Sequence, residues 1–264
     1  MYDAHNHLAD ARFGEAQAAL LMTCLSAGVT RMVVNGTCES DWPQVLALAQ
    51  KFPAVLPSFG LHPWYVHERT PHWRDNLIHF LDAVPSAIGE IGLDRWKPAL
   101  PYEGQEDVFV AHLRLAAERN LPVSIHCLQA WGRLLELLQA GPLPRRGFLL
   151  HSYGGPAELV PPLAKLGAYF SFPGYYAQES KARQRDTFRQ IPLDRLLIET
   201  DAPDQRPPDA LIRFPLTDTV TGQPLNHPAN LGAIYDYAAE LRGLPPATFA
   251  AQVEQNFLRL FADL

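Results

Sequence analysis

The 264-residue sequence contains only three cysteines, Cys24, Cys38 and Cys127, and no Cys-x-x-Cys pair. Three cysteines are too few for a disulfide framework in a chain of this length, and they are typical of reduced thiols in a cytosolic protein. The sequence also lacks a basic segment followed by an apolar core at its start, and it has no run of about 18 apolar residues. We therefore expect no secretion signal, no membrane span and a cytoplasmic location.

Basic residues are too few to create a positive field over the whole chain, since 22 Lys and Arg stand against 28 Asp and Glu, for a net charge of -6. Non-specific attachment to nucleic acid through bulk charge is therefore excluded, and any anion must be bound locally. Hydrophobic residues make up 47% of the chain, which excludes disorder. No glycine-rich phosphate loop follows the first apolar run, which argues against a dinucleotide-binding open sheet.

Short apolar runs alternate with longer segments of helical periodicity, a pattern typical of parallel strands joined by helices. The pattern predicts eight strands, at residues 2–5, 31–35, 55–60, 86–90, 122–126, 148–151, 168–172 and 195–200. Seven segments between and after them carry an apolar stripe at three-to-four spacing. These predicted helices are 14–27, 42–51, 73–83, 105–120, 130–140, 156–166 and 179–190.

The proline-rich segment 202–228 has no clear period and is predicted to be a long loop after the eighth strand. Two further helices, at 228–242 and 246–264, are predicted to close the chain. Eight strand–helix units favour an α/β fold of the (β/α)8 TIM-barrel type, in a single domain over residues 1–264. An open, doubly wound sheet is the weaker alternative.

Ionisable residues gather at the predicted carboxyl ends of the strands, where the active site of such a barrel lies. His5 and His7 share one face of the first strand, because side chains two positions apart point the same way. A His-x-His pair alone is weak evidence for a metal, since ten histidines often produce one by chance. The stronger argument is convergence, because four other strands end in further imidazoles or carboxylates: Glu90, His126, His151 and Asp201.

Four imidazoles and two carboxylates are more ligands than one tetrahedral ion uses, and a carboxylate can bridge two ions. The set therefore predicts a site for two divalent metal ions. The alternative interpretation is a group of core histidines paired with acids and without metal. That arrangement is unfavourable, because it buries several polar groups around one point without cations to neutralise them.

The motifs around these residues resemble those of the TatD family of metal-dependent deoxyribonucleases, within the amidohydrolase-like barrels. The resemblance extends almost from end to end of the chain and implies the (β/α)8 fold of metal-dependent hydrolases. The matching motifs are DAHNH at 3–7, GLHP at 60–63, GEIGLD at 89–94, His126, HSYGG at 151–155, ETDAP at 199–203 and NHPAN at 226–230.

The resemblance implies a division of the ligands between two ions. One ion is held by His5, His7 and Asp201, the other by His126 and His151, and Glu90 bridges them. The identity of the metal stays open, because nitrogen-rich ligand sets suit zinc whereas carboxylate and water ligands suit magnesium or manganese.

The chain departs from the family pattern at two positions. Arg95 follows the acid of the GEIGLD motif, where family members often carry an aromatic residue, and Leu128 stands where they often carry an arginine. Both positions are expected to line the mouth of the site. The departures therefore concern substrate preference and leave the metal chemistry unchanged.

Several residues have predicted roles beside the ligand set. Asp201 is the expected proton acceptor for the attacking water, besides being a ligand. Glu199 and Asp3 are expected to orient ligands from behind, with buried ion pairs as an equally good alternative. His62 is expected to donate a hydrogen bond to a substrate phosphate oxygen and not to bind metal, with a structural loop histidine as its alternative.

Two further groups are ambiguous. The basic residues Lys181, Arg183, Arg185 and Arg189 fit a solvated helix face better than a phosphate site. The aromatic residues Trp64, Trp96 and Tyr153 fit core packing or loop anchoring better than stacking on nucleobases.

The sequence thus predicts a deoxyribonuclease, acting as an exonuclease on DNA or another phosphodiester, with water activated by two metal ions. A lactone, amide or ester hydrolase is the alternative, because the same activated water can attack a carbonyl carbon. A non-catalytic scaffold stabilised by metal is the third hypothesis. No obligate protein partner is indicated.

Overall fold

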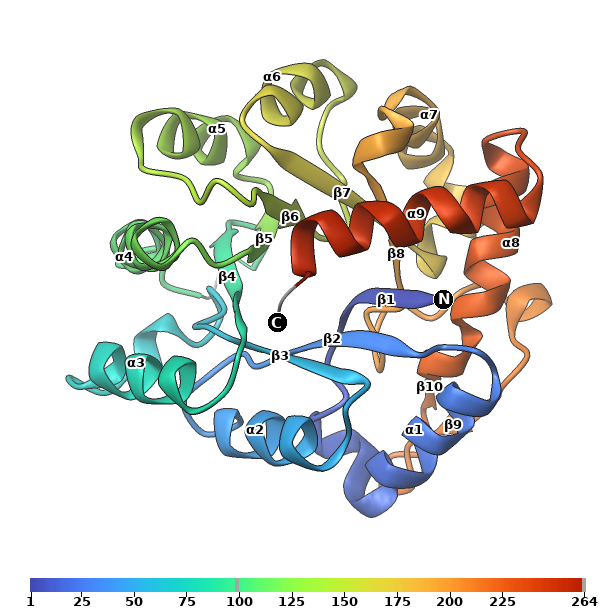
Figure 1. Cartoon of the computed structure of the whole chain (residues 1–264), viewed down its shortest axis with the longest axis horizontal. Helices are drawn as coiled ribbons and strands as arrows, with labels where there is room; N and C mark the ends of the chain where they lie inside the picture. The colour runs from blue at the N-terminus through green and yellow to red at the C-terminus, as the bar shows by residue number, and fades with distance from the viewer. Residues whose placement is uncertain (98–99, 263–264) are drawn as a thin grey trace.

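The computed structural model describes residues 1–97 and 100–262. Eight parallel strands form one sheet in chain order, with helices around it, so the structure is a nearly closed (β/α)8 barrel (Figure 1). The strands are β1 (Tyr2–Asn6), β2 (Arg31–Asn35), β3 (Val55–Phe59), β4 (Ala87–Asp94), β5 (Val123–Leu128), β6 (Phe148–Leu150), β7 (Ala168–Pro173) and β8 (Leu196–Glu199).

The strands form where the sequence has short runs of branched and aromatic residues, which suit the inside of a parallel sheet covered on both faces. Every residue of β3, β4, β7 and β8 is buried accordingly. Two backbone hydrogen bonds join the segments at the carboxyl ends of β1 and β8. They run from Asp201 N–H to His5 O at 3.0 Å and from His7 N–H to Ala202 O at 2.8 Å.

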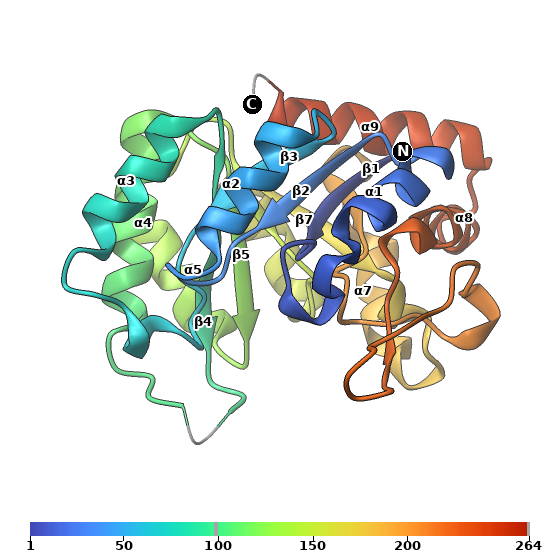
Figure 2. The same ribbon diagram turned by 90° about the horizontal axis from the view of Figure 1, so that it is seen from below.

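The fourth strand is longer than the sequence pattern predicts, because β4 continues to Asp94 where the prediction ends at Glu90. Its pairing with β5 shifts register between Ile88 and Ile91, and then continues to the pair Asp94–Leu128. The two strands therefore extend together beyond the rim of the barrel, as the long arrows in Figure 2 show. Glu90 lies within β4, and its N–H donates to the carbonyl oxygen of Gly36, directly after β2, at 2.8 Å.

The helices match the predicted segments, with shifts at their ends. They are α1 (Gln17–Ser26), α2 (Trp42–Lys51), α3 (Trp73–Ala83), α4 (Gln105–Arg119), α5 (Trp131–Ala140), α6 (Val160–Lys165), α7 (Ala182–Gln190), α8 (Leu231–Leu241) and α9 (Pro246–Phe261). The segments predicted as single helices at 156–166, 179–190 and 228–242 each begin with a 3-10 turn. Residues 263–264 of the predicted last helix lie outside the described residues.

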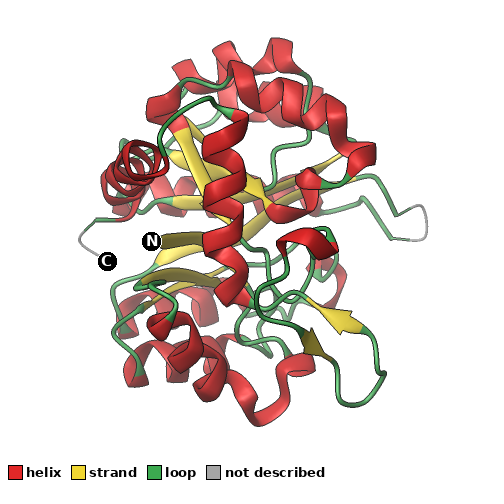
Figure 3. Ribbon diagram, turned by 90° about the vertical axis from the view of Figure 1, so that its right-hand side faces the viewer, coloured by secondary structure: helices red, strands yellow, loops and turns green. Residues whose placement is uncertain are grey.

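The segment predicted as a loop at 202–228 contains a small antiparallel hairpin, β9 (Leu216–Thr217) with β10 (Pro224–Leu225), visible in Figure 3. The Asp218 carboxylate stabilises its turn by accepting hydrogen bonds from the N–H groups of Val220 and Thr221. Strands of two residues are too short to produce an alternating pattern, so they cannot be predicted from the sequence.

The last helix, α9, lies across the amino-terminal end of the barrel, opposite the carboxyl ends of the strands (Figures 1 and 2). Asn256 on α9 donates hydrogen bonds to the carbonyl oxygens of Leu193 and Leu196 at the start of β8, both at 2.8 Å. Phe257 contacts the ring of Tyr2 at the start of β1. Helix α9 thus closes the core at this end and leaves the other end for the site. None of the helices among the described residues is long and apolar enough to cross a membrane.

Candidate metal centre

The six predicted ligands come together at the carboxyl end of the barrel, although they are spread over almost 200 positions of the sequence. Glu90 is the centre of the cluster. Its Oε2 lies 3.1 Å from His7 Nε2 and 3.3 Å from His5 Nε2. Its Oε1 lies 2.8 Å from His151 Nε2 and 3.1 Å from His126 Nδ1. The two oxygens of one carboxylate therefore divide the imidazoles into two pairs.

Asp201 joins the pair of imidazoles on the first strand. Its Oδ1 lies 3.5 Å from His7 Nε2 and 3.6 Å from His5 Nε2. Its Oδ2 accepts a hydrogen bond of 2.7 Å from the side-chain amide of Gln205. The backbone bond from Asp201 to His5 described above fixes this carboxylate next to β1, so the closure of the barrel also assembles half of the cluster.

The imidazoles of His5 and His7 are held from behind by their other nitrogens. His7 Nδ1 lies 3.0 Å from the carbonyl oxygen of Asn35, and His5 Nδ1 lies 2.7 Å from the hydroxyl of Ser124. Groups of this kind fix the orientation and tautomer of a histidine that binds metal. In both rings Nε2 is consequently the nitrogen that faces Glu90 and Asp201.

Asp94 orients the ring of His126 in the same way, although the sequence pattern did not predict a role for it. His126 Nε2–H donates to Asp94 Oδ2 at 3.0 Å, and the indole N–H of Trp64 donates to the same oxygen at 2.7 Å. Gln105 fixes the backbone of Asp94 through two hydrogen bonds, to its N–H and its carbonyl. The available signal was its place in the GEIGLD motif, four positions after Glu90.

Glycine at position 92 allows β4 to approach β5 at this point. A Cβ added to Gly92 would lie 1.9 Å from the carbonyl oxygen of His126, and the residue has a φ of +151°. A larger side chain would push the two strands apart. The position of His126 relative to Glu90 therefore depends on this glycine.

His62 also lies in the cluster, with Nε2 3.4 Å from Glu90 Oε1. Its Nδ1 accepts a hydrogen bond of 3.1 Å from the backbone N–H of Trp64. A neutral imidazole that accepts at Nδ1 carries its proton on Nε2. The ring is therefore arranged as a hydrogen-bond donor toward the centre of the site.

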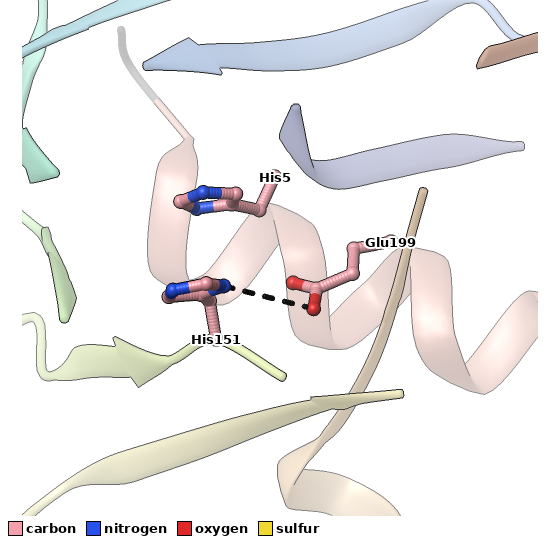
Figure 4. Close-up of side chains that lie close together, drawn as sticks. All are labelled: His5, His151 and Glu199. Atoms are coloured by element: carbon pink, nitrogen blue, oxygen red, sulfur yellow. Dashed lines mark ion pairs between the residues drawn. The ribbon is translucent and has the colours of Figure 1, made fainter. Parts of the chain in front are cut away.

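Glu199 lies behind His151, as Figure 4 shows. Its Oε1 is 3.9 Å from His151 Nδ1 and accepts hydrogen bonds from the backbone N–H and the hydroxyl of Ser152. Ser171 donates to its other oxygen. The ring of His151 stacks on that of His5, with centroids 4.1 Å apart. Glu199 thus contacts a predicted ligand and the residue after it.

Asp3 forms no ion pair with any residue that the structure describes, and it connects β1 to the end of β8. Its carboxylate accepts hydrogen bonds from Thr200, at 3.0 Å from the N–H and 2.6 Å from the hydroxyl. It also accepts from the side-chain amide of Asn6 and the N–H of His5. Asp3 therefore fixes the backbone beside His5 and Asp201 without contacting their side chains.

Burial and mutual attraction determine the charges in the cluster. Burial acts to raise the pKa of Glu90, but the imidazoles of His151, His62 and His5 outweigh it and hold that pKa well below its usual range. Burial is likewise outweighed at Asp201, whose pKa falls to about 2 beside His7 and His151. Burial opposes the charged form of His151, yet Glu90 raises its pKa to about 9. Both central carboxylates are therefore ionised and attract positive charge.

The donor set fits divalent metal ions. Three groups of side chains have nitrogen or carboxylate oxygen atoms within 4.8 Å of one another: His5 with His7 and Glu90, His62 with Glu90 and His126, and His5 with His151 and Glu199. The buried Nδ1 of His151 has no hydrogen-bond partner among residues 1–97 and 100–262. Imidazole nitrogen and carboxylate oxygen are the ligands that zinc and related ions take in catalytic sites. Ionised carboxylates buried in this way need cations to neutralise them.

A cavity of about 750 Å³ opens over the cluster. Leu128 lines it, as expected from the sequence. Arg95 is not among the lining residues, because its guanidinium lies 4.0 Å from the ring centroid of Tyr102. Of the four basic residues after β7, Lys181 alone lines the cavity, and Arg185 instead donates to the carbonyl oxygen of Tyr176 at 2.8 Å.

The chain is similar over its whole length to proteins of a known family. A family profile described as TatD related DNase matches residues 2–262. A protein of Escherichia fergusonii named 3'-5' ssDNA/RNA exonuclease TatD is 33% identical, over 99% of this chain and 98% of its own length. A protein of Escherichia coli named uncharacterized metal-dependent hydrolase YjjV is 29% identical, over 98% of this chain and 96% of its own length.

Similarity also extends to solved structures. The crystal structure of YjjV, described as a TatD homologue from Escherichia coli, superposes with a TM-score of 0.88 at 28% identity. The superposition covers 99% of this chain and 97% of that one. The similarity therefore includes the whole barrel.

Proposed function

Because the chain belongs to the family of TatD related DNases, we propose that this metal-dependent hydrolase is an exonuclease that removes nucleotides from an end of DNA. The observation that carries the proposal is the arrangement around Glu90. One carboxylate oxygen faces His5 and His7, and the other faces His126 and His151. A bridging carboxylate with a set of ligands on each side is the arrangement expected for two metal ions.

Two divalent ions would be held by these residues together with Asp201, which lies on the side of His5 and His7. Bound there, they would lower the pKa of a water molecule and offset the negative charge of a phosphodiester. Zinc, magnesium and manganese are the candidates, because the ligand set mixes imidazoles with carboxylates.

The local charge favours an anionic substrate. Two divalent ions with ionised Glu90 and Asp201 leave about +2 at the mouth of the barrel. The chain as a whole carries a net charge of -6. A phosphate group would therefore be attracted to this point of the surface and repelled elsewhere.

Two residues have roles beside metal binding in this proposal. Asp201, which lines the cavity, accepts the proton of the attacking water. His62 donates from Nε2 to a phosphate oxygen, since Trp64 N–H occupies its other nitrogen. Asp94, Glu199 and Asp3 position the ligands and do not contact the reacting atoms.

The test is hydrolysis of end-labelled single-stranded DNA by purified protein in manganese, magnesium or zinc. We expect stepwise shortening of the labelled strand and its loss in the His126→Ala variant, which lacks a ligand. An intact strand under all three metals, or equal cleavage by the variant, would contradict the proposal.

A lactone, amide or ester hydrolase is the second candidate. It is favoured by Leu128, an apolar residue at the mouth, and by the orientation of Arg95 away from the cavity. Parallel assays on lactone, amide and ester panels decide between the two, because the second candidate requires higher kcat/KM on those substrates than on DNA.

We also propose that the enzyme acts in the cytoplasm. Cys24, Cys38 and Cys127 are all free in the structure, which fits a reducing compartment.

A further inference from the structure

Exposed aromatic side chains are concentrated at the cavity. Among the residues that the structure describes, five large hydrophobic side chains are exposed: Met22, Trp96, Tyr175, Val220 and Leu258. The two aromatic ones, 53% and 36% exposed, are also the two that line the cavity over the candidate metal centre. Large exposed aromatic surface next to a catalytic site is a feature of ligand-binding walls.

Trp96 is anchored to the cluster through its backbone. Its N–H donates to Asp94 Oδ1 at 2.6 Å, while the other oxygen of Asp94 accepts from His126. The indole itself has no ring contact among the described residues and stays exposed at the mouth. Trp64 differs in this respect, since its indole N–H is bound to Asp94 and Lys97 Nζ lies 3.2 Å from its ring centroid.

Tyr175 lies in the 3-10 turn Gly174–Ala177, directly after β7. Its side chain is partly exposed and lies beside Lys181. Lys181 Nζ lies 4.6 Å from the ring centroid of Tyr175 and also lines the cavity. No carboxylate pairs with Lys181 in the described part of the chain. The other basic residues that line the cavity are already paired, Arg12 with Asp10 and Asp204, and Arg206 with Asp209.

The two aromatic residues come from different elements of the same rim. Trp96 follows β4 and Tyr175 follows β7, so both lie at the carboxyl ends of the strands, the end toward which β4 and β5 point in Figure 2. The cavity between the elements of the rim, about 750 Å³, is of the size that holds a small organic ligand.

We propose that Trp96 and Tyr175 are stacking platforms for the nucleobases on either side of the scissile phosphate, and that Lys181 binds a neighbouring phosphate. Aromatic rings with interleaved lysines bind single strands in this way, because every base has a face that can stack. A base can stack on protein only when it is not stacked in a duplex. Each of the two rings would therefore hold one unpaired base. This inference rests on the proposed function.

The experiment compares two oligothymidylates of five nucleotides. One is complete, and the other keeps the sugar–phosphate backbone but lacks the two bases next to the terminal linkage. Each is cleaved by the metal-loaded wild type and by Trp96→Ala, Tyr175→Ala and Met22→Ala. The last variant removes a comparably exposed apolar side chain remote from the cavity. A small diester, bis(4-nitrophenyl) phosphate, reports on the metal centre alone.

We expect the wild type to prefer the complete oligonucleotide by at least roughly 25-fold in kcat/KM, because stacking of each of the two bases should contribute at least about fivefold. Trp96→Ala and Tyr175→Ala should reduce this preference at least about fivefold, mainly through KM, with a smaller change on the small diester. Phenylalanine at either position should restore it, and Met22→Ala should leave it intact.

Two results would overturn the inference. If both alanine variants keep the wild-type preference for the complete oligonucleotide, the aromatic residues do not bind bases, and the proposed nuclease function still stands. If the wild type cleaves neither oligonucleotide under any metal, the proposed function fails and the inference fails with it.

Discussion

The side chain of His126 is fixed between two carboxylates, with Nε2–H donating to Asp94 Oδ2 at 3.0 Å and Nδ1 facing Glu90 Oε1 at 3.1 Å. Asp94 thereby determines which nitrogen carries the proton and which is available as a ligand. This relationship makes Asp94 part of the candidate metal centre, through its contact with His126.

Substitution of Asp94 by asparagine should weaken metal binding. The amide cannot accept as strongly from His126 and leaves the ring tautomer undetermined, so we expect a loss of roughly 10- to 100-fold in metal affinity. The measurement is titration of metal-free protein with zinc by calorimetry. Asp186→Asn, at an exposed position of α7, is the matched control. Equal affinities in the Asp94 variant and the wild type would show that Asp94 does not position His126.

Substitution of Gly92 by alanine should destabilise the barrel. The added methyl group would overlap the carbonyl oxygen of His126, and alanine is strained at a positive φ. We expect the free energy of unfolding to fall by about 2–4 kcal/mol, as for overpacking combined with backbone strain. Urea unfolding measures the change.

Gly132→Ala supplies the control for Gly92. Gly132 lies in α5, and a Cβ there would have no neighbour within 4 Å. Alanine at this position should be neutral or should stabilise the protein by up to about 1 kcal/mol. If both variants unfold at the same urea concentration, close packing of β4 against His126 does not stabilise the fold.

Acid should destabilise the protein partly through His112, a residue remote from the metal centre. Burial lowers the pKa of His112 to about 4, from an ordinary value of 6.5, and its ring stacks on Trp73. Between these values the unfolded chain binds a proton that the folded chain does not. The contribution of His112 is therefore complete above pH 6.5 and is lost as the pH falls toward 4, by up to about 1.4 kcal/mol per pH unit.

The variant His112→Phe isolates this contribution, because it keeps an aromatic ring against Trp73 and removes the titrating group. Unfolding free energies of the wild type and the variant, measured in urea between pH 7.5 and 5, should diverge below pH 6.5 as the wild type loses more stability. Other titrating groups are common to both proteins and cancel in the difference. Parallel curves over the whole range would contradict the prediction.

Local sequence patterns were sufficient to predict the barrel. In the described part of the chain, the eight strands of the barrel and the nine α-helices match the predicted segments closely, because strands buried on both faces and amphipathic helices each have a distinct period. The hairpin that contains Leu216 and Leu225 was not predicted, since its strands are too short to show a period. The extension of β4 to Asp94 was not predicted either, because glycines interrupt the apolar run there.

The candidate ligands were predictable for a related reason. The barrel places every strand end at one rim, so ionisable residues at five strand ends had to meet once the strands were identified. Asp94 was not assigned because the predicted strand ended at Glu90. Its contact with His126 depends on the paired extension of β4 and β5, which the sequence pattern does not indicate.

The exposure of individual aromatic residues could not be predicted from the sequence. Tyr153 is fully buried, with its hydroxyl bound to the carbonyl oxygen of Pro156, whereas Trp96 is exposed at the cavity. Both follow strands in the sequence, and only the packing of other elements around them separates a core residue from a candidate binding residue. Lys181 and Arg185 differ for the same reason.

The most direct test of the account is anomalous diffraction from crystals of the protein soaked in manganese. We predict two anomalous peaks on either side of Glu90, one beside His5, His7 and Asp201 and the other beside His126 and His151, and loss of both in Glu90→Gln. A map with no peak among these side chains, or one that the Glu90 variant leaves unchanged, would contradict the bridged two-metal centre.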